Sequence, residues 1–395
     1  MLIFLLFDIS VIHRGEMEVQ NLLDSVLEER LCSILDKCGV EINGNNDYDI
    51  WVLDNNFYRK VLFSGTLGLG EAYMAGLWEC ERIDKFVSLV LSADIDKEIR
   101  INPSAFILSI MPWFLNLQSV KRAFNIGKAH YDFSNEFFSQ MLDKRMIYSC
   151  GFWHGAENLD EAQENKLDLI CRKIYLEPGM KILDIGCGWG GFAKFAAEKY
   201  GANVVGITVS KEQAEFAKIN CHGLPVEIRL QDYRSLDYEK FDRIVSIGMF
   251  EHVGPRNYQA YMKAVHSCLT DNGLFLLHTI GGNKSVFSVD PWINKYIFPG
   301  GVLPSIKQIG ESIEKFFVME DWHNFGTDYD KTLMEWYENF EKTWSDIRNQ
   351  YDEKFYRMWK YYLLVCAGAF RARNIQLWQI ILSKKIFGEY KSIHY

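Results

Sequence analysis

The 395-residue chain contains no run of 18 apolar residues, so a transmembrane helix is not expected. Its first residues lack a basic n-region and an Ala-x-Ala cleavage site, so they do not predict a signal peptide. None of the nine cysteines belongs to a Cys-x-x-Cys pair, which disfavours a zinc ribbon or a thioredoxin-type site, and no metal centre is expected. An odd number of scattered cysteines favours reduced thiols in a cytoplasmic protein.

A basic surface is also lacking, because the formal net charge is -9. Residues 1–115 hold 9 Lys and Arg against 18 Asp and Glu, whereas the remaining residues hold 34 of each kind. This balance disfavours nucleic acid as a partner, since contacts with phosphates need cations. Two local groups of cations stand out, namely Lys121, Arg122 and Lys128, and separately Arg371 and Arg373. Each group either contacts anionic lipid or a polar head group, or forms a solvated face.

The apolar fraction of 48% and the charged fraction of 24% are ordinary for a globular protein, and the length predicts about two or three domains. Aromatic residues make up 15% of the chain, which indicates an aromatic-walled cavity, a lipid-facing surface or a large aromatic core. We expect a mostly helical accessory domain with its linker over residues 17–115 and a catalytic domain over residues 116–395. Met17 is a candidate start, which would make residues 1–16 a spurious extension.

The N-terminal part carries three further patterns. Apolar residues at helical spacing predict a helix within residues 18–40, ended by Gly39. The segment GTLGLG, residues 65–70, follows no clean strand and has no basic residue, so packing glycines are favoured over a phosphate loop. Residues 93–116 are expected to be a linker, and residues 111–128 have the composition of a membrane-interface segment or of a buried linker.

From about residue 160, predicted strands and helices alternate, which is typical of a largely parallel sheet covered by helices on both faces. Helices are expected over residues 190–201, after Ser210 as N-cap, and over residues 257–269. Ligands of such sheets bind at the carboxyl ends of the strands. The predicted strands span residues 181–186, 203–209, 226–231, 241–248, 273–280, 316–325 and 377–384.

The sharpest motif is LDIGCGWGG, residues 183–191, between the first of these strands and its helix. Gly186, Gly188 and Gly190 allow a tight turn and a close approach of backbone to a ligand. A dinucleotide site is disfavoured, because the spacing is not G-x-G-x-x-G and no acidic residue ends the second strand. The order of Asp184 and the glycines resembles the first motif of S-adenosylmethionine-dependent methyltransferases.

A second signal comes from Gln231 and Asp232, which follow the third strand, where these methyltransferases usually place an acidic residue beside the adenine. The two signals together predict an α/β protein with the class I, Rossmann-like methyltransferase sheet of seven strands and a smaller, mostly helical N-terminal domain. A packing turn in an unrelated α/β domain is the alternative.

Three polar residues are expected at the ends of three consecutive strands. Glu251 follows the strand that ends near residue 248, His278 lies near the end of the next strand, and Tyr329 follows the strand after that. A carboxylate, an imidazole and a phenol that converge at the ligand-binding edge suggest proton handling or a small polar guest. Helix caps and turn hydrogen bonds are the alternative explanation.

Several blocks between about Asp49 and Ser383 resemble the cyclopropane-fatty-acyl-phospholipid synthases. The block LGLGEAYMAGLWEC favours the bacterial phospholipid enzymes, since the related mycolic-acid cyclopropane synthases lack a comparable N-terminal domain. The other blocks are NLQSVKRAFNIGKAHYDFSNEFF, MIYSCGFW, EHVGPRNY, LLHTI, VDPWINKYIFPGGVLPS, MEDWHNFGTDYD and CAGAFRARNIQLWQ.

The resemblance implies methylene transfer from S-adenosylmethionine to the cis double bond of an acyl chain in a phospholipid. It implies that a bicarbonate ion is held by Cys150, Glu251, His278, Ile280 and Tyr329. Attack by the alkene leaves a carbocation, which aromatic faces stabilise and from which water must be excluded. The positions that the resemblance assigns to S-adenosylmethionine are Tyr148, Ser149, Asp184, Gly186, Cys187, Gly188, Gly190, Thr208, Gln213, Gln231 and Asp232.

The resemblance also marks Cys366, in CAGAFRAR, as an active-site cysteine, although a structural role is favoured over a nucleophilic one for a buried cysteine. It implies a homodimer that is peripherally associated with the inner face of the cytoplasmic membrane, with phospholipid acyl chains as partners. Two enzyme alternatives remain, namely a lipid methyltransferase that makes methyl-branched or oxygenated chains and a small-molecule methyltransferase. A nucleotide-binding module or an inactive paralogue is the alternative that is not an enzyme.

Overall fold

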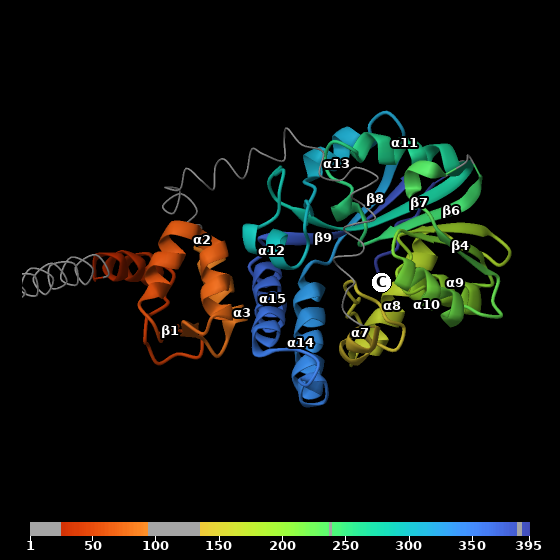
Figure 1. Ribbon diagram of the computed structural model, residues 1–395. Coiled ribbons are helices and arrows are strands. Elements are labelled where there is room, and N and C mark those ends of the chain that lie inside the picture. The colour runs from red at the N-terminus through yellow and green to blue at the C-terminus, as the bar shows by residue number, and fades with distance from the viewer. Residues whose placement is uncertain (1–24, 94–134, 237–238, 385–388) are drawn as a thin grey trace, which may run out of the picture.

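The computed structural model describes residues 25–93, 135–236, 239–384 and 389–395. Its N-terminal helices lie at one end of the molecule, beside a larger part in which helices cover a twisted sheet (Figure 1). Within the described residues, no helix is both long enough and apolar enough to cross a bilayer.

The larger part is built on a seven-stranded sheet of order β5-β4-β3-β6-β7-β9-β8. The five strands from β5 to β7 are parallel to their neighbours, whereas β9 pairs antiparallel with both β7 and β8. This confirms the largely parallel sheet. The strands span β3 Lys181–Ile185, β4 Asn203–Thr208, β5 Val226–Leu230, β6 Phe241–Ile247, β7 Leu269–Gly282, β8 Val318–Asn324 and β9 Ile375–Ser383.

Helices cover both faces of this sheet because side chains of alternate strand residues are buried on opposite sides. One core joins Ile182 and Val204 to apolar residues of α8 and α9, and the other joins Leu183 and Ile185 to residues of α11 and α13. Ser210 caps α10 through the N–H of Gln213, as expected, and Gly201 ends α9 with φ of 62°. These helices span α8 Leu159–Lys173, α9 Gly191–Tyr200, α10 Lys211–Asn220, α11 Tyr258–Cys268 and α13 Ile306–Ile313.

The last third of the chain differs from the sequence-based prediction. Two long helices, α14 Thr327–Ile347 and α15 Glu353–Arg371, stand between β8 and β9, where no helix was predicted. The three polar residues do lie at or after the ends of strands that are consecutive along the chain, although β9 separates β8 from β7 in the sheet and Tyr329 lies in the first turn of α14. His278 lies inside β7, which runs to Gly282 because it is paired with β9 along its length.

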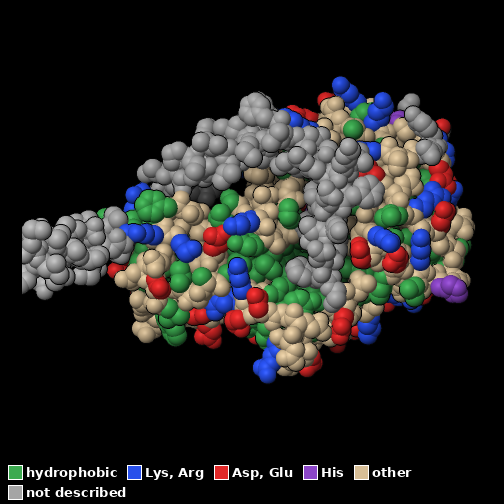
Figure 2. All heavy atoms as spheres, viewed as in Figure 1, with side chains coloured by type: hydrophobic (Ala, Val, Ile, Leu, Met, Phe, Trp, Pro, Cys, Tyr) green, Lys and Arg blue, Asp and Glu red, His purple; other side chains and the backbone are tan. Residues whose placement is uncertain are grey.

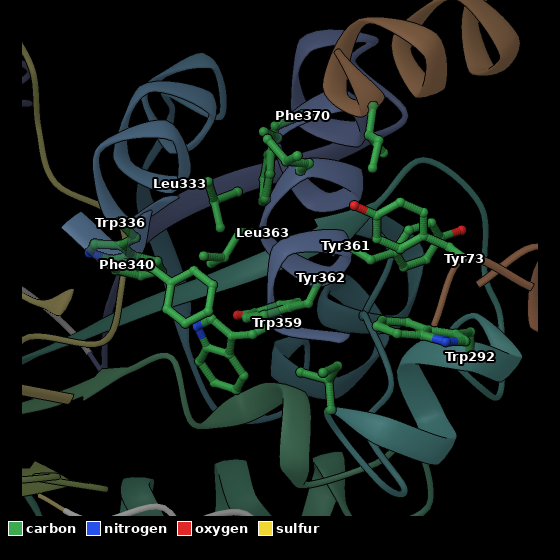
Figure 3. Packing of buried hydrophobic residues seen from close by; sticks show 14 of the residues in the cluster. Tyr73, Trp292, Leu333, Trp336, Phe340, Trp359, Tyr361, Tyr362, Leu363 and Phe370 are labelled. Carbon is green, nitrogen blue, oxygen red and sulfur yellow. The ribbon is translucent and has the colours of Figure 1, made fainter. Parts of the chain in front are cut away.

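The N-terminal part shares its core with the larger part instead of forming a separate one. Residues 25–36 are helical, as predicted, and are followed by β1 Trp51–Val52, α2 Asn56–Met74, β2 Trp78–Glu79 and α3 Ile83–Ser92. Tyr73 of α2 stacks on Tyr361 of α15, and the close-up in Figure 3 shows these rings beside Trp292 of α12. The helix α12 spans Pro291–Tyr296.

Gly68 and Gly70 are packing glycines, as favoured from the sequence, whereas Gly65 forms a kink with φ of 56°. They lie inside α2, and a Cβ atom on Gly70 would come within 2.4 Å of the Trp292 ring. The predicted linker, the membrane-interface segment and the cations Lys121, Arg122 and Lys128 lie almost wholly outside the described residues. The domain boundary near residue 115 therefore stays a prediction.

Candidate active site

A cavity of about 1030 Å³ opens at the carboxyl ends of the central strands. It is lined by fourteen of the predicted site residues, and by Leu69, Val87 and Val90 of the N-terminal helices. Gly190, Cys150 and His278 do not line it. The fourteen are Tyr148, Ser149, Asp184, Gly186, Cys187, Gly188, Thr208, Gln213, Gln231, Asp232, Glu251, Ile280, Tyr329 and Cys366.

The glycine loop between β3 and α9 forms one wall of the cavity. Gly186 and Gly188 have φ of 86° and 54°, which L-residues rarely adopt. A Cβ atom on Gly188 would have no atom within 4 Å, so it would project into open space instead of into the protein. The loop leads into the N-terminus of α9, where main-chain N–H groups favour an anionic group. The backbone therefore offers an open cradle suited to a carboxylate.

Asp184 lies beneath this loop and is fully buried, with its Oδ2 atom unpartnered among the described residues. Burial raises the pKa of Asp184 to about 7, although the nearby Lys166 opposes the shift. Lys166 of α8 is itself buried, donates to Ser149 Oγ at 3.0 Å, and has its pKa lowered to about 8 by burial. The site thus contains a desolvated carboxylate and a desolvated amine close to the same loop.

Two further walls come from the ends of β4 and β5. Thr208 Oγ lies 3.1 Å from Gln213 Oε1, which ties the end of β4 to the first turn of α10. Asp232 accepts from Arg234 Nε and Nη2 at 2.7 and 2.6 Å, so its carboxylate is held in place by a guanidinium. The predicted residues after these strands therefore do meet at the cavity.

Glu251 lies in a single-turn helix, Phe250–His252, directly after β6. Its Oε1 atom accepts from the main-chain N–H of Ile280 at 2.7 Å, whereas Oε2 is buried and has no partner among the described residues. Burial raises the pKa of Glu251 to about 7, and the hydrogen bond from Ile280 partly offsets this rise. The unpartnered oxygen is a strong acceptor for a small guest in the cavity.

His278 lies in β7, two residues before Ile280, and is 1% exposed. Gln379 of β9 lies directly across the strand pair, and its Nε2 atom is 3.3 Å from His278 Nδ1. Burial lowers the pKa of His278 well below its usual value, so the ring is neutral. Because the Gln379 amide donates to Nδ1, the ring proton lies on Nε2, which has no partner among the described residues.

Tyr329 and Cys150 complete the group of predicted bicarbonate ligands. Tyr329 stacks on Phe370 with ring centroids 4.5 Å apart, and burial raises the pKa of its phenol, with Cys150 and Glu251 adding to the rise. Cys150 is fully buried and lies 3.7 Å from Thr332 Oγ1 of α14. Glu251 and Cys150, which derive from distant segments, therefore both act on the charge of the Tyr329 phenol.

Cys366 lines the cavity from α15, and burial raises the pKa of its thiol to about 12. The negative charge of Asp290 contributes to this rise. A thiol with this pKa is not a thiolate at neutral pH, which is the form that acts as a nucleophile.

Some residues of the site were not predicted from the sequence. Lys166, Gln379 and Thr332 stand in segments that look like an ordinary helix face or strand, and no motif marks them. Among the aromatic residues at this end of the sheet, Phe298 lines the cavity, whereas Phe152 and Trp322 do not.

The seven-stranded sheet with a glycine loop after its first strand has the fold of class I S-adenosylmethionine-dependent methyltransferases. The chain belongs to the mycolic acid cyclopropane synthetase family, because the family model matches residues 118–380. It is 54% identical over 353 residues, 89% of this chain and 92% of the relative, to a cyclopropane-fatty-acyl-phospholipid synthase of Escherichia coli K12. A probable fatty acid methyltransferase of Pseudomonas putida is 40% identical over 65% of this chain and 68% of its own length.

Solved structures agree with this family. The cyclopropane synthase MmaA2 from Mycobacterium tuberculosis superposes with a TM-score of 0.62 at 34% identity, over 66% of this chain and 98% of that one. The mycolic acid cyclopropane synthase CmaA1, solved in complex with SAH and CTAB, has the same TM-score and coverage at 35% identity.

Proposed function

We propose that the chain transfers a methylene group from S-adenosylmethionine to the cis double bond of an acyl chain in a membrane phospholipid, forming a cyclopropane ring. The observation that carries this proposal concerns Glu251, which lines the glycine-loop cavity, and His278, which lies in β7 two residues before the N–H of Ile280 that binds Glu251. Both are buried, and each has an unpartnered polar atom among the described residues. The Escherichia coli relative, which bears the name of this activity, supports the substrate class.

The residues of the loop fit the proposed methyl donor. When bound, S-adenosylmethionine supplies a sulfonium methyl group as the one-carbon unit. Gly186 and Gly188 would give backbone room for the methionine part, and the N-terminus of α9 would favour its carboxylate. Asp232, Gln231, Thr208 and Gln213 would bind the rest from the ends of β5 and β4, with Tyr148, Ser149 and Cys187 completing the wall and Gly190 behind it as the N-cap of α9.

An alkene is a weak nucleophile, so the acyl chain must be held close to the methyl carbon and in line with it. Formation of the new C–C bond turns the second alkene carbon into a cation, and loss of a proton from the added methyl group then closes the ring. The aromatic rings of Tyr148, Phe298, Tyr329 and Tyr362 line the cavity and can stabilise this positive charge. Their bulk also excludes water, which would otherwise trap the cation as an alcohol.

We further propose a bicarbonate ion as the acceptor of that proton. Glu251 Oε2 would accept from a protonated oxygen of the ion, while His278 Nε2 and the Tyr329 hydroxyl would donate to its other oxygens. Ile280 contributes through its N–H, which fixes Glu251 Oε1. Cys150 would close the pocket from behind.

The proposal includes a homodimer that associates with the inner face of the cytoplasmic membrane. For the N-terminal part, the support comes from composition. Its acidity disfavours direct binding to anionic lipid and favours dimer formation or domain packing as its role. The test is to express residues 116–395 alone. If this fragment keeps both full activity on vesicles and the oligomeric state of the whole chain, the domain has another purpose.

The function itself is tested by mass spectrometry of unsaturated phospholipids incubated with the protein and S-adenosylmethionine. Gain of one CH₂ with loss of the alkene supports ring formation. The Pseudomonas putida relative favours a second candidate, a methyl-branched product, which would carry two further hydrogens after reduction. An unchanged lipid together with methylation of a small amine or alcohol would contradict both.

A further inference from the structure

The cavity has a basic rim that the proposed chemistry does not use. Four exposed residues line it where β7 and α15 end, namely Asn283, Lys284, Arg373 and Asn374. Val286, which is 38% exposed, lines it beside them. Deeper in the cavity the walls are largely apolar and aromatic, with Tyr361, Val365 and Phe298 among them. The opening therefore combines cations with apolar groups, as a lipid head group and its acyl chain would require.

The backbone at Arg373 is built into a fixed turn. Arg373 has φ of 56°, a conformation that costs free energy for any residue other than glycine. Its carbonyl oxygen accepts from Asn283 Nδ2 at 2.8 Å and from Gln376 Nε2 at 2.7 Å, and these two bonds hold the turn. A long cationic side chain thus occupies a backbone position on the rim at which glycine would have the lower conformational free energy.

The other lysine and arginine residues of the lining are already engaged. Lys166 donates to Ser149 and Arg234 is paired with Asp232, whereas the side chains of Lys284 and Arg373 have no hydrogen bond or ion pair among the described residues. Asp290 is the acidic residue of the lining that lies nearest to Lys284 along the chain. Its carboxylate accepts from the N–H groups of Trp292 and Ile293 as the cap of α12. The rim therefore presents two positive charges that are open to an anion.

Arg371, which the sequence groups with Arg373, is not available for this purpose. Its guanidinium binds Asp330 through Nε and Nη2 at 2.9 and 2.8 Å, and Asp84 through Nη1 at 2.5 Å. The face shown in Figure 2 offers no broad positive patch that could attract an anionic group in place of Arg371, because cations and anions are interspersed over it. Attraction to an anionic group must therefore come from local contacts on the rim.

The spacing also suits a phospholipid. Lys284 follows Ile280, whose N–H binds Glu251, by four residues, so the backbone between them spans at most about 14 Å. The hydrocarbon core of a bilayer is about 30 Å thick, which places the middle of an acyl chain roughly 7 or 8 Å from the head-group end of its leaflet. A double bond beside Glu251 would thus leave the phosphate within reach of the long side chains on the rim.

We propose that Lys284 and Arg373 bind the phosphodiester group of the substrate phospholipid, so that this site selects phosphate-bearing lipids and sets the depth of the acyl chain. This inference rests on the proposed function. It assigns Lys284 and Arg373 to substrate binding and gives them no part in the chemical step.

The test compares two substrates in the same neutral detergent micelle, an unsaturated phosphatidylglycerol and a diacylglycerol with the same acyl chains. Arg373→Gln and Lys284→Gln should each raise the KM for the phospholipid by about tenfold, because each loses one charge-assisted contact. Both should leave kcat and the affinity for S-adenosylmethionine unchanged. On diacylglycerol, the variants should match the wild type, which itself should have a higher KM there than on the phospholipid.

Two controls make the result specific. Lys307→Gln removes the same charge from an exposed position on α13 outside the cavity lining, and it should not change the KM. Arg373→Gly should raise the KM as Arg373→Gln does while keeping the unfolding midpoint at least as high, because glycine suits the left-handed turn.

Several outcomes would overturn the inference. An unchanged KM in both variants, or an equal rise in Lys307→Gln, would mean that the rim holds no phosphate or that attraction is general. Calorimetric binding of inorganic phosphate alone, lost in Arg373→Gln without any change in phospholipid KM, would assign the rim to free phosphate instead. Conversion of both lipids with equal KM would refute the subsite and leave the proposed function standing. Conversion of neither lipid by the wild type would refute the proposed function and this inference with it.

Discussion

Gln379 Nε2 lies 3.3 Å from His278 Nδ1, and both side chains are buried in adjacent strands of the sheet. This contact leaves the ring proton on Nε2, the atom that is proposed to donate to the ion. Gln379 is therefore a positioning residue for the proton acceptor.

Gln379→Leu should lower kcat by about tenfold to a hundredfold while leaving the affinity for S-adenosylmethionine unchanged, because the ring loses the contact that selects its tautomer. Gln379→Glu should instead raise the pKa of His278, since a carboxylate stabilises the protonated ring. Its activity should therefore fall at a higher pH than that of the wild type as pH is lowered. An unaltered pH profile in Gln379→Glu would argue for a purely structural glutamine.

Removal of the carboxylate at position 251 tests the group that is proposed to hold the bicarbonate base in position. Glu251→Ala should reduce turnover by about 10²–10⁴-fold, the usual cost of losing a positioned base, with S-adenosylmethionine binding nearly unchanged. Degassed, bicarbonate-free buffer should slow the wild type, and added bicarbonate should restore its rate. Indifference of the wild type to bicarbonate would count against an exchangeable ion, and a fully active Glu251→Ala would remove the residue from the site.

The same residue should make stability depend on pH. Burial raises the pKa of Glu251 from 4.5 to about 7 in the folded chain, so the native state binds more protons than the unfolded state above pH 4.5. Stability is therefore lost as pH rises through this window, and the full penalty of roughly 3 kcal/mol is present above pH 7. Glu251→Gln lacks that penalty. Urea unfolding should show it more stable than the wild type at pH 8 and nearly equal at pH 4.5.

The matched control is Glu311→Gln, which removes an exposed carboxylate of α13 whose side chain is 64% exposed. It should change the free energy of unfolding little at either pH. A pH-independent effect of Glu251→Gln would show that its carboxylate is not desolvated.

Cys366→Ser should keep turnover within about tenfold of the wild type, because a thiol with a pKa near 12 is not a nucleophile at neutral pH. A bulky thiol reagent should nevertheless inactivate the wild type, since the side chain lines the cavity and any adduct would fill it. Activity measured before and after reagent treatment in both proteins separates the two effects. A thousandfold loss in Cys366→Ser would restore a chemical role.

The sequence predicts the part of the site that local patterns encode. Glycines at positive φ, a capping serine and period-two apolar runs act over a few residues, so β3, the glycine loop and α10 were found close to their true bounds. Glu251 and His278 were placed because they stand in or directly after strands of one sheet.

The remaining features depend on contacts between distant segments. Gln379 is 101 residues from His278 in the sequence, and Lys166 is an ordinary lysine on a polar helix until α8 packs beneath the glycine loop. The helices α14 and α15 were missed because their sequences are rich in aromatic and charged residues. Their buried faces are defined by packing against α2, α3 and α7, which no local pattern shows. The helix α7 spans Asn135–Met141.

The junction between the N-terminal helices and α15 supplies a last prediction. Asp84 of α3 is 0% exposed and accepts from Arg371 Nη1 at 2.5 Å and from Arg82 Nε at 2.9 Å. Burial alone would raise the pKa of Asp84, but the two guanidinium groups hold it below its usual value. Arg371 also binds Asp330, the neighbour of Tyr329 in α14. One buried carboxylate thus links the N-terminal part to the helix that carries the proposed phenol donor.

Asp84→Asn should destabilise the chain by roughly 1–3 kcal/mol, because it leaves two guanidinium groups, 41% and 31% exposed, without the buried carboxylate that they share. It should also lower kcat, since α14 loses part of the framework that fixes Tyr329. Asp47→Asn is the matched control, because it breaks the half-exposed pair between Asp47 and Lys85 in the same domain and should cost less than about 1 kcal/mol. Urea unfolding and single-turnover kinetics measure the two effects. An Asp84→Asn chain as stable as Asp47→Asn would mean that the junction is held by apolar packing alone.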